Sequence, residues 1–248
     1  MTVYLVGAGP GDPGLLTVRA AELLRDCDVV VHDRLVSDAI LAMVPLWAER
    51  VDVGKRVGGG VTQATINKIL IDRGSRYSSV VRLKGGDPHV FGRAAEELIA
   101  LRDAGIAAEV VPGVSAALAA PAAVGIPLTT RIASSGFTVI TAHQDPTNDR
   151  TLDWSALAKL GTTLVILMGA SRAAAIRDRL LAGGMPGSTP VAIIGNATQP
   201  NQTEIRATLA ELGNQPIESP ATIVVGDVAA LDLRSIVVPI TTHEVVQR

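Results

Sequence analysis

Short apolar runs alternate with helix-like segments through the first 111 residues, and this alternation limits the folds that the chain can adopt. Val3–Val6 and Val29–Val31 are apolar runs that stop at turn-forming or polar residues, as buried strands do. Between them, Thr17–Arg25 places apolar residues on one face, which is typical of a helix. Strands that alternate with helices predict a parallel sheet covered by helices on both faces.

The later segments extend this α/β pattern into a second unit. Strands after Pro112-Gly113 have the spacing of hairpins, so we expect the second sheet to be mixed. The expected domains are residues 1–113 and 114–235, followed by a tail, 236–248. The further expected helices are Ser37–Met43, Gln63–Arg73, Ala94–Ala104, Ser115–Val124 and Ser171–Leu181, and the further expected strands are Val51–Val53, Val80–Leu83, Ala108–Val111, Phe137–Ile140, Thr163–Met168, Val191–Ile194, Thr203–Arg206 and Ala221–Val225.

The composition argues against a nucleic-acid-binding protein. Aromatic residues make up only 2% of the chain, which leaves few rings for stacking on bases. The formal net charge is −2, so no overall positive field attracts polyanions. An anionic substrate would have to meet a local cluster of basic side chains.

The single cysteine, Cys27, cannot form a disulfide within the chain, and we expect it to be a buried structural thiol. The first residues lack the basic and apolar regions of a signal peptide, and no run reaches the length of a membrane span. We therefore expect a cytoplasmic protein that does not contact a membrane. We also expect no metal site, because metal-ligand spacing is absent among His32, His89, His143 and His243.

The turn Gly85-Gly86-Asp87 follows an apolar run and is the strongest candidate for a binding site. Glycine lets a ligand approach the main chain closely, and Asp-Pro places a carboxylate beside a fixed turn. In open α/β sheets, ligands bind just beyond the carboxyl ends of the strands. The turn is therefore expected to form the floor of a site.

Neighbouring strands end in charged residues that should lie at the same edge as this turn. Asp33-Arg34 follows the second strand, and Lys55-Arg56 follows the third. Asp33 is well placed for acid–base chemistry, although it could instead cap a turn, and Lys55 could be a solvated loop cation. A local basic rim that suits a small polycarboxylate substrate is expected from Arg34, Lys55, Arg56, Lys84 and Arg93.

The glycine-rich loop after the first strand does not match a dinucleotide-binding fingerprint. Position 12 is Asp where the fingerprint requires glycine, and Pro10 and Pro13 hinder the start of a helix. His143 and Met168 also follow strands, where each could contact a ligand or serve only the structure.

Taken together, the motifs resemble those of the S-adenosylmethionine-dependent uroporphyrinogen-III C-methyltransferases, of the tetrapyrrole methylase superfamily. The resemblance covers about residues 3–232. It is carried by Val6-Gly7-Ala8-Gly9-Pro10-Gly11-Asp12-Pro13, Asp33-Arg34-Leu35-Val36, Gly54-Lys55-Arg56, Leu83-Lys84-Gly85-Gly86-Asp87-Pro88, Val90-Phe91-Gly92-Arg93, Pro112-Gly113, Gly125-Ile126-Pro127-Leu128-Thr129 and Ser219-Pro220-Ala221.

The resemblance implies two α/β domains with the active site in the cleft between them, and a homodimer. It implies methylation of uroporphyrinogen III at C2 and C7, giving precorrin-2 for sirohaem and cobalamin synthesis. It makes Asp33 the expected proton acceptor and Lys55 the expected proton donor. The expected cofactor-binding residues are Pro10, Gly85, Gly86, Asp87, Val90, Ser115, Ala116, Met168, Ala197 and Ala221, and the expected substrate-binding residues are Arg34, Arg56, Arg93 and Arg131.

The chain departs from the family pattern at His89, Ala94, Ala95, Thr130, Ala142 and Ala197. These departures bear on the geometry around the substrate more than on cofactor binding. Three alternatives stay open: a methyltransferase acting on a later corrinoid precursor, a binding protein that has lost activity, and a nicotinamide-dependent oxidoreductase.

Overall fold

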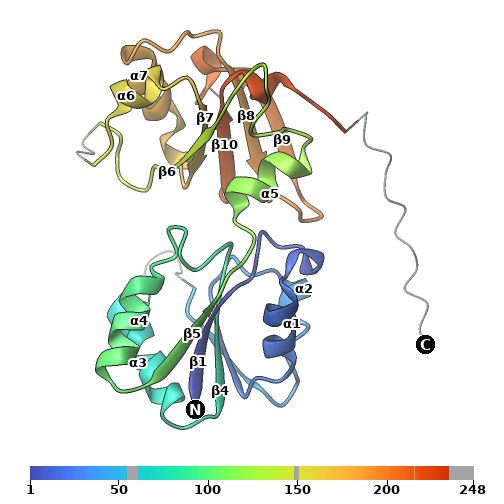
Figure 1. The fold of residues 1–248 in the computed structure, drawn as a ribbon, viewed down its shortest axis with the longest axis vertical. Coiled ribbons are helices and arrows are strands. Elements are labelled where there is room, and N and C mark those ends of the chain that lie inside the picture. The colour runs from blue at the N-terminus through green and yellow to red at the C-terminus, as the bar shows by residue number, and fades with distance from the viewer. Residues whose placement is uncertain (55–60, 148–150, 215, 235–248) are drawn as a thin grey trace.

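The computed structural model describes residues 1–54, 61–147, 151–214 and 216–234. Two five-stranded sheets occupy separate halves of the molecule, and residues 112–115 connect them (Figure 1). The expected α/β fold is confirmed. The tail predicted at residues 236–248 lies outside the described residues.

The first sheet is parallel throughout, as the alternation of strands and helices predicts. Its strand order is β3-β2-β4-β1-β5, so the carboxyl ends of all five strands lie at one edge. The strands are β1 (Thr2–Gly7), β2 (Val29–His32), β3 (Glu49–Asp52), β4 (Ser79–Lys84) and β5 (Ala107–Val111).

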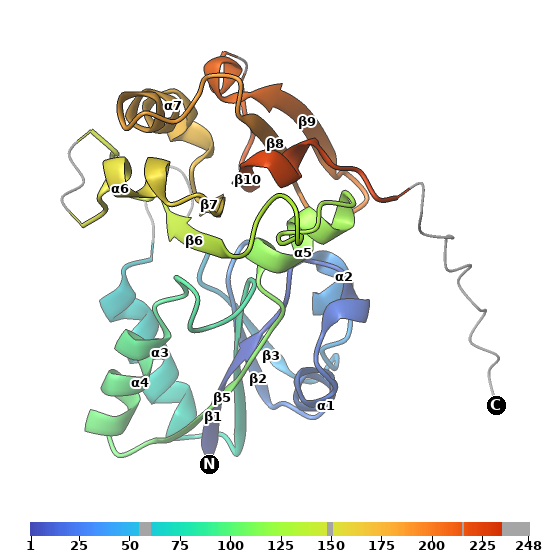
Figure 2. The same cartoon turned by 45° about the horizontal axis from the view of Figure 1, so that its top comes forward.

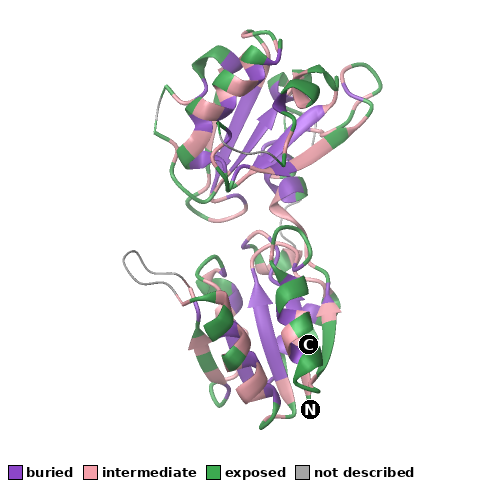
Figure 3. Cartoon of the chain, turned by 90° about the vertical axis from the view of Figure 1, so that its left-hand side faces the viewer, coloured by how far each residue is buried: buried purple, intermediate pink, exposed green. Residues whose placement is uncertain are grey.

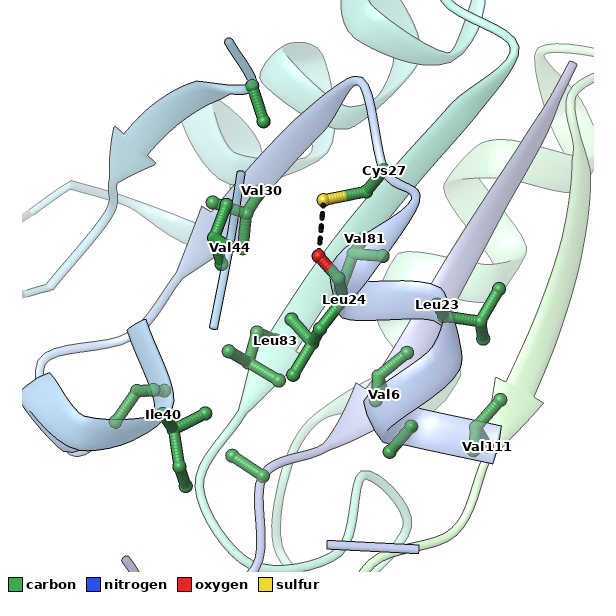
Figure 4. Close-up of a cluster of buried hydrophobic side chains, with 14 residues drawn as sticks. Val6, Leu23, Leu24, Cys27, Val30, Ile40, Val44, Val81, Leu83 and Val111 are labelled. Atoms are coloured by element: carbon green, nitrogen blue, oxygen red, sulfur yellow. Dashed lines mark hydrogen bonds between the residues drawn. The ribbon is translucent and has the colours of Figure 1, made fainter. Parts of the chain in front are cut away.

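Helices cover both faces of this sheet. On one face, α1 (Val18–Arg25) and α2 (Asp38–Leu41) pack against valine and leucine side chains of β1, β2 and β4 (Figure 4). On the other face, α3 (Gln63–Gly74) and α4 (Ala94–Asp103) lie side by side (Figure 1, Figure 2). The 3-10 turn η1 (Pro13–Leu15) follows the glycine-rich loop.

The second sheet is mixed, as expected, in the order β6-β7-β10-β8-β9. Only β6 and β7 pair in parallel, while the other neighbours are antiparallel. Because β7 and β8 are both antiparallel to β10, their carboxyl ends lie beside the start of β10. The strands are β6 (Phe137–Thr141), β7 (Thr163–Leu167), β8 (Pro190–Gly195), β9 (Thr203–Thr208) and β10 (Ala221–Val225).

Helices also pack on both faces of the second sheet. The alanine-rich α5 (Ala116–Ala123) and the 3-10 helix η4 (Asp227–Ala230) pack on one face. On the other face, α6 (Trp154–Lys159) and α7 (Ala173–Ala182) cover the sheet (Figure 2). The short 3-10 segments are η2 (Ala170–Arg172) and η3 (Leu209–Glu211).

Aliphatic side chains fill the interior of both halves, and burial follows the central strands of each sheet (Figure 3). Cys27 is fully buried, as predicted, and its Sγ donates to the carbonyl of Leu24 at 3.4 Å (Figure 4). No helix in the described part of the chain is long and apolar enough to cross a membrane.

Several boundaries differ from the sequence-based expectation, and two of them lie after β7. The strand expected to end at Met168 ends at Leu167, because Met168 has a left-handed backbone with φ of 57°. The helix expected from Ser171 begins as a 3-10 turn, and the α-helix starts at Ala173.

Candidate active site

The turn after β4 pairs with the loop after β1 at the carboxyl edge of the first sheet. The N–H of Gly9 donates to the carbonyl of Gly86 at 3.1 Å, and the N–H of Gly86 donates to the carbonyl of Gly9 at 2.8 Å. Gly86 has φ of 67°, which glycine adopts without steric cost. A pair of main-chain hydrogen bonds thus joins the two loops to each other.

The carboxylate of Asp87 fixes this turn from within. Its Oδ1 accepts the N–H of His89 at 2.8 Å, and its Oδ2 accepts the N–H of Gly113 at 3.0 Å. A carboxylate has further lone pairs, so these two bonds leave acceptor capacity for a ligand.

The start of α5 lies against the same turn. A Cβ built on Gly86 would lie 3.8 Å from the Cα of Ser115 and from the N of Ala116. Ser115 caps α5, because its side chain accepts the N–H of Ala117 at 3.2 Å. Pro10 is half-buried in the loop after β1, and Val90 is exposed just after the turn.

Three other predicted cofactor-binding residues meet at one edge of the second sheet. Ala221 opens β10 and pairs with Gly195, the last residue of β8. Met168 follows β7, and Ala197 lies two residues beyond β8. The antiparallel register therefore brings together residues that are far apart in the sequence.

The loops at the two edges touch. The N–H of Asp12, after β1, donates to Oγ1 of Thr198, after β8, at 3.3 Å. A Cβ built on Gly11 would lie 2.7 Å from Cγ of Gln199. The loop beside Gly86 and the loop beside Ala197 are therefore neighbours.

Backbone strain gathers in these loops. Within the described ranges, the non-glycine residues with positive φ all follow β4, β7 or β8, and they are Phe91, Arg93, Met168, Asn196 and Thr198. Each such conformation costs about 1–3 kcal/mol and is commonest at functional sites. The strain marks the same edges as the predicted residues.

Asp33 lies directly after β2, and its side chain is 31% exposed. Its Oδ1 accepts a hydrogen bond from Nη2 of Arg82 at 2.7 Å. Among the described residues no group donates to its Oδ2. The predicted proton donor Lys55 and the predicted substrate-binding residue Arg56 lie outside the described residues.

Lys84 does not belong to a basic rim, and this expectation is wrong. Its side chain is 3% exposed, and its Nζ lies 3.0 Å from both carboxylate oxygens of Glu97. Glu97 also accepts from Nε of Arg82 at 3.2 Å. Burial, followed by the charge of Arg82, lowers the pKa of Lys84, and Glu97 opposes this shift.

The described arginines predicted to bind substrate differ in their surroundings. Arg34 is exposed beside Asp33. Arg93 forms two 2.7 Å hydrogen bonds to Glu96, which raise its pKa. Arg131 is exposed in the loop before β6, and this loop forms hydrogen bonds to Thr163 at the start of β7. Because Met168 follows the other end of β7, the structure does not bring Arg131 together with Met168.

The buried group of Arg82, Lys84 and Glu97 is the feature that the sequence reasoning missed. A signal exists, because Arg82 and Lys84 are two residues apart in a strand and so share one face. Two charges on one face of an otherwise apolar strand indicate a buried partner. Nothing local points to Glu97, which lies on the next helix.

Comparisons with known proteins agree with this geometry. Residues 2–213 match the family model for the Tetrapyrrole (Corrin/Porphyrin) Methylases. The chain is 46% identical over 235 residues to an S-adenosyl-L-methionine-dependent uroporphyrinogen III methyltransferase of Methanosarcina barkeri, covering 92% of each chain. It is 50% identical over 232 residues to siroheme synthase 3 of Aeromonas hydrophila, covering 92% of this chain but only 49% of that protein.

Among solved structures, the fold is similar to a uroporphyrin-III C-methyl transferase of Thermus thermophilus, which was crystallised with S-adenyl homocysteine. The TM-score is 0.81 and the identity is 38%, and the match covers 93% of this chain and 94% of that one. The chain thus spans about half the length of the siroheme synthase it matches, but nearly all of a stand-alone methyltransferase.

Proposed function

This chain belongs to the tetrapyrrole methylase family, and we propose that it is a methyltransferase that methylates uroporphyrinogen III at C2 and C7. S-adenosylmethionine would be the methyl donor, and precorrin-2, for sirohaem and cobalamin synthesis, the product. The observation that carries this proposal is the match to the Methanosarcina enzyme over nearly the whole of both chains.

The residues at the two sheet edges fit a cofactor of this kind. Gly86 has no Cβ and lies against the Cα of Ser115 and the N of Ala116, which lets a nucleoside-bearing ligand approach the backbone. The carboxylate of Asp87 is held in place and keeps acceptor capacity for hydroxyl or amino groups. The cofactor would lie between these edges, held by Pro10, Gly85, Gly86, Asp87, Val90, Ser115, Ala116, Met168, Ala197 and Ala221.

S-adenosylmethionine supplies, when bound, a methyl group made electrophilic by a sulfonium. The chain's own residues would mainly hold the pyrrole carbon in line with that methyl group, since positioning accounts for much of the rate of such a transfer. Asp33 would accept the proton that the macrocycle loses, because its carboxylate is partly exposed and its Oδ2 has no donor in the described residues. Lys55 would be the proton donor.

The substrate carries eight carboxylates, which require basic partners at the site. Arg34 and Arg93 are exposed at the same edge as Asp33 and would meet them. Arg56 completes the proposed set, whereas Arg131 lies beside the start of β7, at the other end of that strand from Met168. Arg93 would have to exchange Glu96 for a substrate carboxylate.

The proposal extends to organisation and location. The domains would comprise residues 1–113 and 114–235, with a tail at 236–248. The active form would be a homodimer, and the protein would act in the cytoplasm. The single thiol, buried and without a disulfide partner, is consistent with a reducing compartment.

The test is an anaerobic incubation of the protein with uroporphyrinogen III and S-adenosylmethionine, followed by mass spectrometry. The expected product has gained two methyl units. A parallel incubation with a later corrinoid precursor distinguishes the nearest alternative, because methylation of that compound alone would overturn the proposal. Binding of S-adenosylhomocysteine without any methyl transfer would instead identify a protein that binds but does not catalyse.

A further inference from the structure

Glu97 is a carboxylate with no exposed surface (0%) that serves two buried cations at once. It accepts hydrogen bonds from Arg82, from Lys84 and, at 3.2 Å, from Nε2 of Gln63. Burying three charges adds little to stability, because apolar side chains of similar size would often serve as well. Such a cluster therefore calls for an explanation other than folding.

Arg82 connects this buried carboxylate to the surface of the candidate site. Its guanidinium is 2% exposed and donates through Nε to Glu97 and through Nη2 to Asp33. Its Nη1 lies 3.4 Å from the carbonyl of Val31 and 3.3 Å from that of Leu83. With acceptors on all three nitrogens, the planar group cannot rotate without breaking bonds.

Glu97 also supplies the carboxylate with which Lys84 pairs. The two cations Arg82 and Lys84 lie on the same face of β4 and repel each other in a setting shielded from water. Without the charge of Glu97, Asp33 would be the one carboxylate still bonded to this pair among the described residues. Its side chain would then be drawn inward toward the cations.

We propose that Glu97 is a positioning residue that acts through Arg82 to hold Asp33 ready for proton transfer. Arg82 engages Oδ1 of Asp33, whereas Oδ2 has no donor among the described residues. The proton lost by the methylated macrocycle moves to Oδ2, and the electrons of the broken bond return to the ring and neutralise its positive charge. This inference rests on the proposed function.

The test is a double-mutant cycle between Glu97→Gln and Asp33→Asn, because both substitutions keep size and remove charge. We expect Glu97→Gln to lower kcat about 10- to 100-fold, while KM and the Kd for S-adenosylhomocysteine change less than about threefold. In the Asp33→Asn background, Glu97→Gln should lower kcat by less than about twofold. The effects of the two substitutions on kcat should not add, because Glu97 would act on catalysis only through Asp33.

A matched control separates positioning from folding. Leu101, one turn further along α4, is fully buried in the aliphatic cluster on this face of the sheet and has no charge. Leu101→Ala should lower Tm while kcat per folded molecule stays within about twofold. Glu97→Asp, which keeps the charge on a shorter side chain, should recover part of the lost kcat, and it replaces Glu97→Gln in the cycle if the latter does not fold.

The inference is overturned if Glu97→Gln leaves kcat unchanged, or if it lowers kcat equally in both backgrounds. A fall in cofactor affinity that matches the fall in kcat would also overturn it, because that result indicates a general structural role. Failure of the proposed function gives a different result, namely a wild-type protein that transfers no methyl groups.

Discussion

The carboxylate of Asp87 accepts the main-chain N–H of Gly113 at 3.0 Å, although the two residues are 26 positions apart. The bond ties the turn after β4 to the segment that leads from β5 into α5. It also holds the turn against the residues that precede the second sheet. Asp87 therefore shapes the candidate cofactor site even before any ligand is bound.

Replacing Asp87 should weaken both the fold and the binding of cofactor. Asp87→Ala leaves two N–H groups without an acceptor, which should cost about 1–3 kcal/mol of unfolding free energy. Asp87→Asn keeps one acceptor oxygen and should cost less. Urea unfolding and calorimetry with S-adenosylhomocysteine measure the two effects.

The control Asp103→Ala removes an exposed surface ion pair and should change stability by less than about 1 kcal/mol. An Asp87→Ala variant as stable as this control would contradict the prediction.

Gly113 should tolerate no side chain. A Cβ at this position would lie 2.3 Å from the carbonyl oxygen of Gly86 and 2.7 Å from the Cα of Gly7, both of which are backbone atoms. Gly113→Ala should therefore separate the two loops and cost several kcal/mol, on the order of 3, with loss of cofactor binding. In the control Gly136→Ala, the new Cβ has only an ordinary contact with Thr162 at 3.7 Å, so Tm should hardly move. Equal Tm values for the two variants would refute the predicted clash.

The central strands were predictable from the sequence because each is a short apolar run between turn residues. The run at Val80–Leu83 is an example, and the structure places it in β4. The helix α6 was not predicted, because its six residues are too few to show a helical period and only Trp154 is buried. Asp153, which caps α6 by accepting the N–H of Ala156, was the available signal.

The site was predictable only where it depends on strand ends. Asp33 and the Gly86 turn lie at one edge because parallel strands end together. The burial of Lys84 was not predictable, because its partner Glu97 lies on a helix that packs against the sheet only in the folded chain. The left-handed backbone of Met168 has no sequence signal, since methionine has no preference for that region.

Removing the carboxylate of Asp33 should impair turnover much more than cofactor affinity. Asp33→Asn keeps an oxygen that can accept from Arg82 but cannot take up a proton at neutral pH, so kcat should fall about 10²- to 10⁴-fold. Asp33→Ala should show the same fall in kcat and a further loss of stability, because it removes a partner of the buried Arg82. Steady-state kinetics and calorimetry with S-adenosylhomocysteine separate these effects. Equal losses of kcat and affinity would make Asp33 a structural residue.

The thiol of Cys27 should make stability fall in alkaline solution. Burial raises its pKa from 9.0 to about 11, so the unfolded chain releases the thiol proton at a lower pH than the folded chain does. The contribution of Cys27 is therefore fully present below pH 9 and is lost as pH rises toward about 11, by about 2–3 kcal/mol in all. Urea unfolding of wild type and Cys27→Ala over this range measures the difference, in which other titrating groups cancel. Parallel pH curves for the two proteins would show that the thiol is not desolvated.

Glycine at position 168 should stabilise the fold relative to alanine, the reverse of the usual order in or beside a strand. Met168 has φ of 57°, a conformation that costs a residue with a Cβ about 1–2 kcal/mol and glycine almost nothing. Met168→Gly should therefore be about 1 kcal/mol more stable than Met168→Ala. The neighbouring Leu167 lies in β7, and there the order should invert, with Leu167→Gly less stable than Leu167→Ala.

Both Met168 variants should bind S-adenosylhomocysteine more weakly than wild type, because the half-exposed side chain would contact the cofactor. If the same replacement is the more stable one at both positions, the left-handed backbone of Met168 is contradicted. If the affinity for S-adenosylhomocysteine is unchanged in both Met168 variants, Met168 does not belong to the proposed cofactor site.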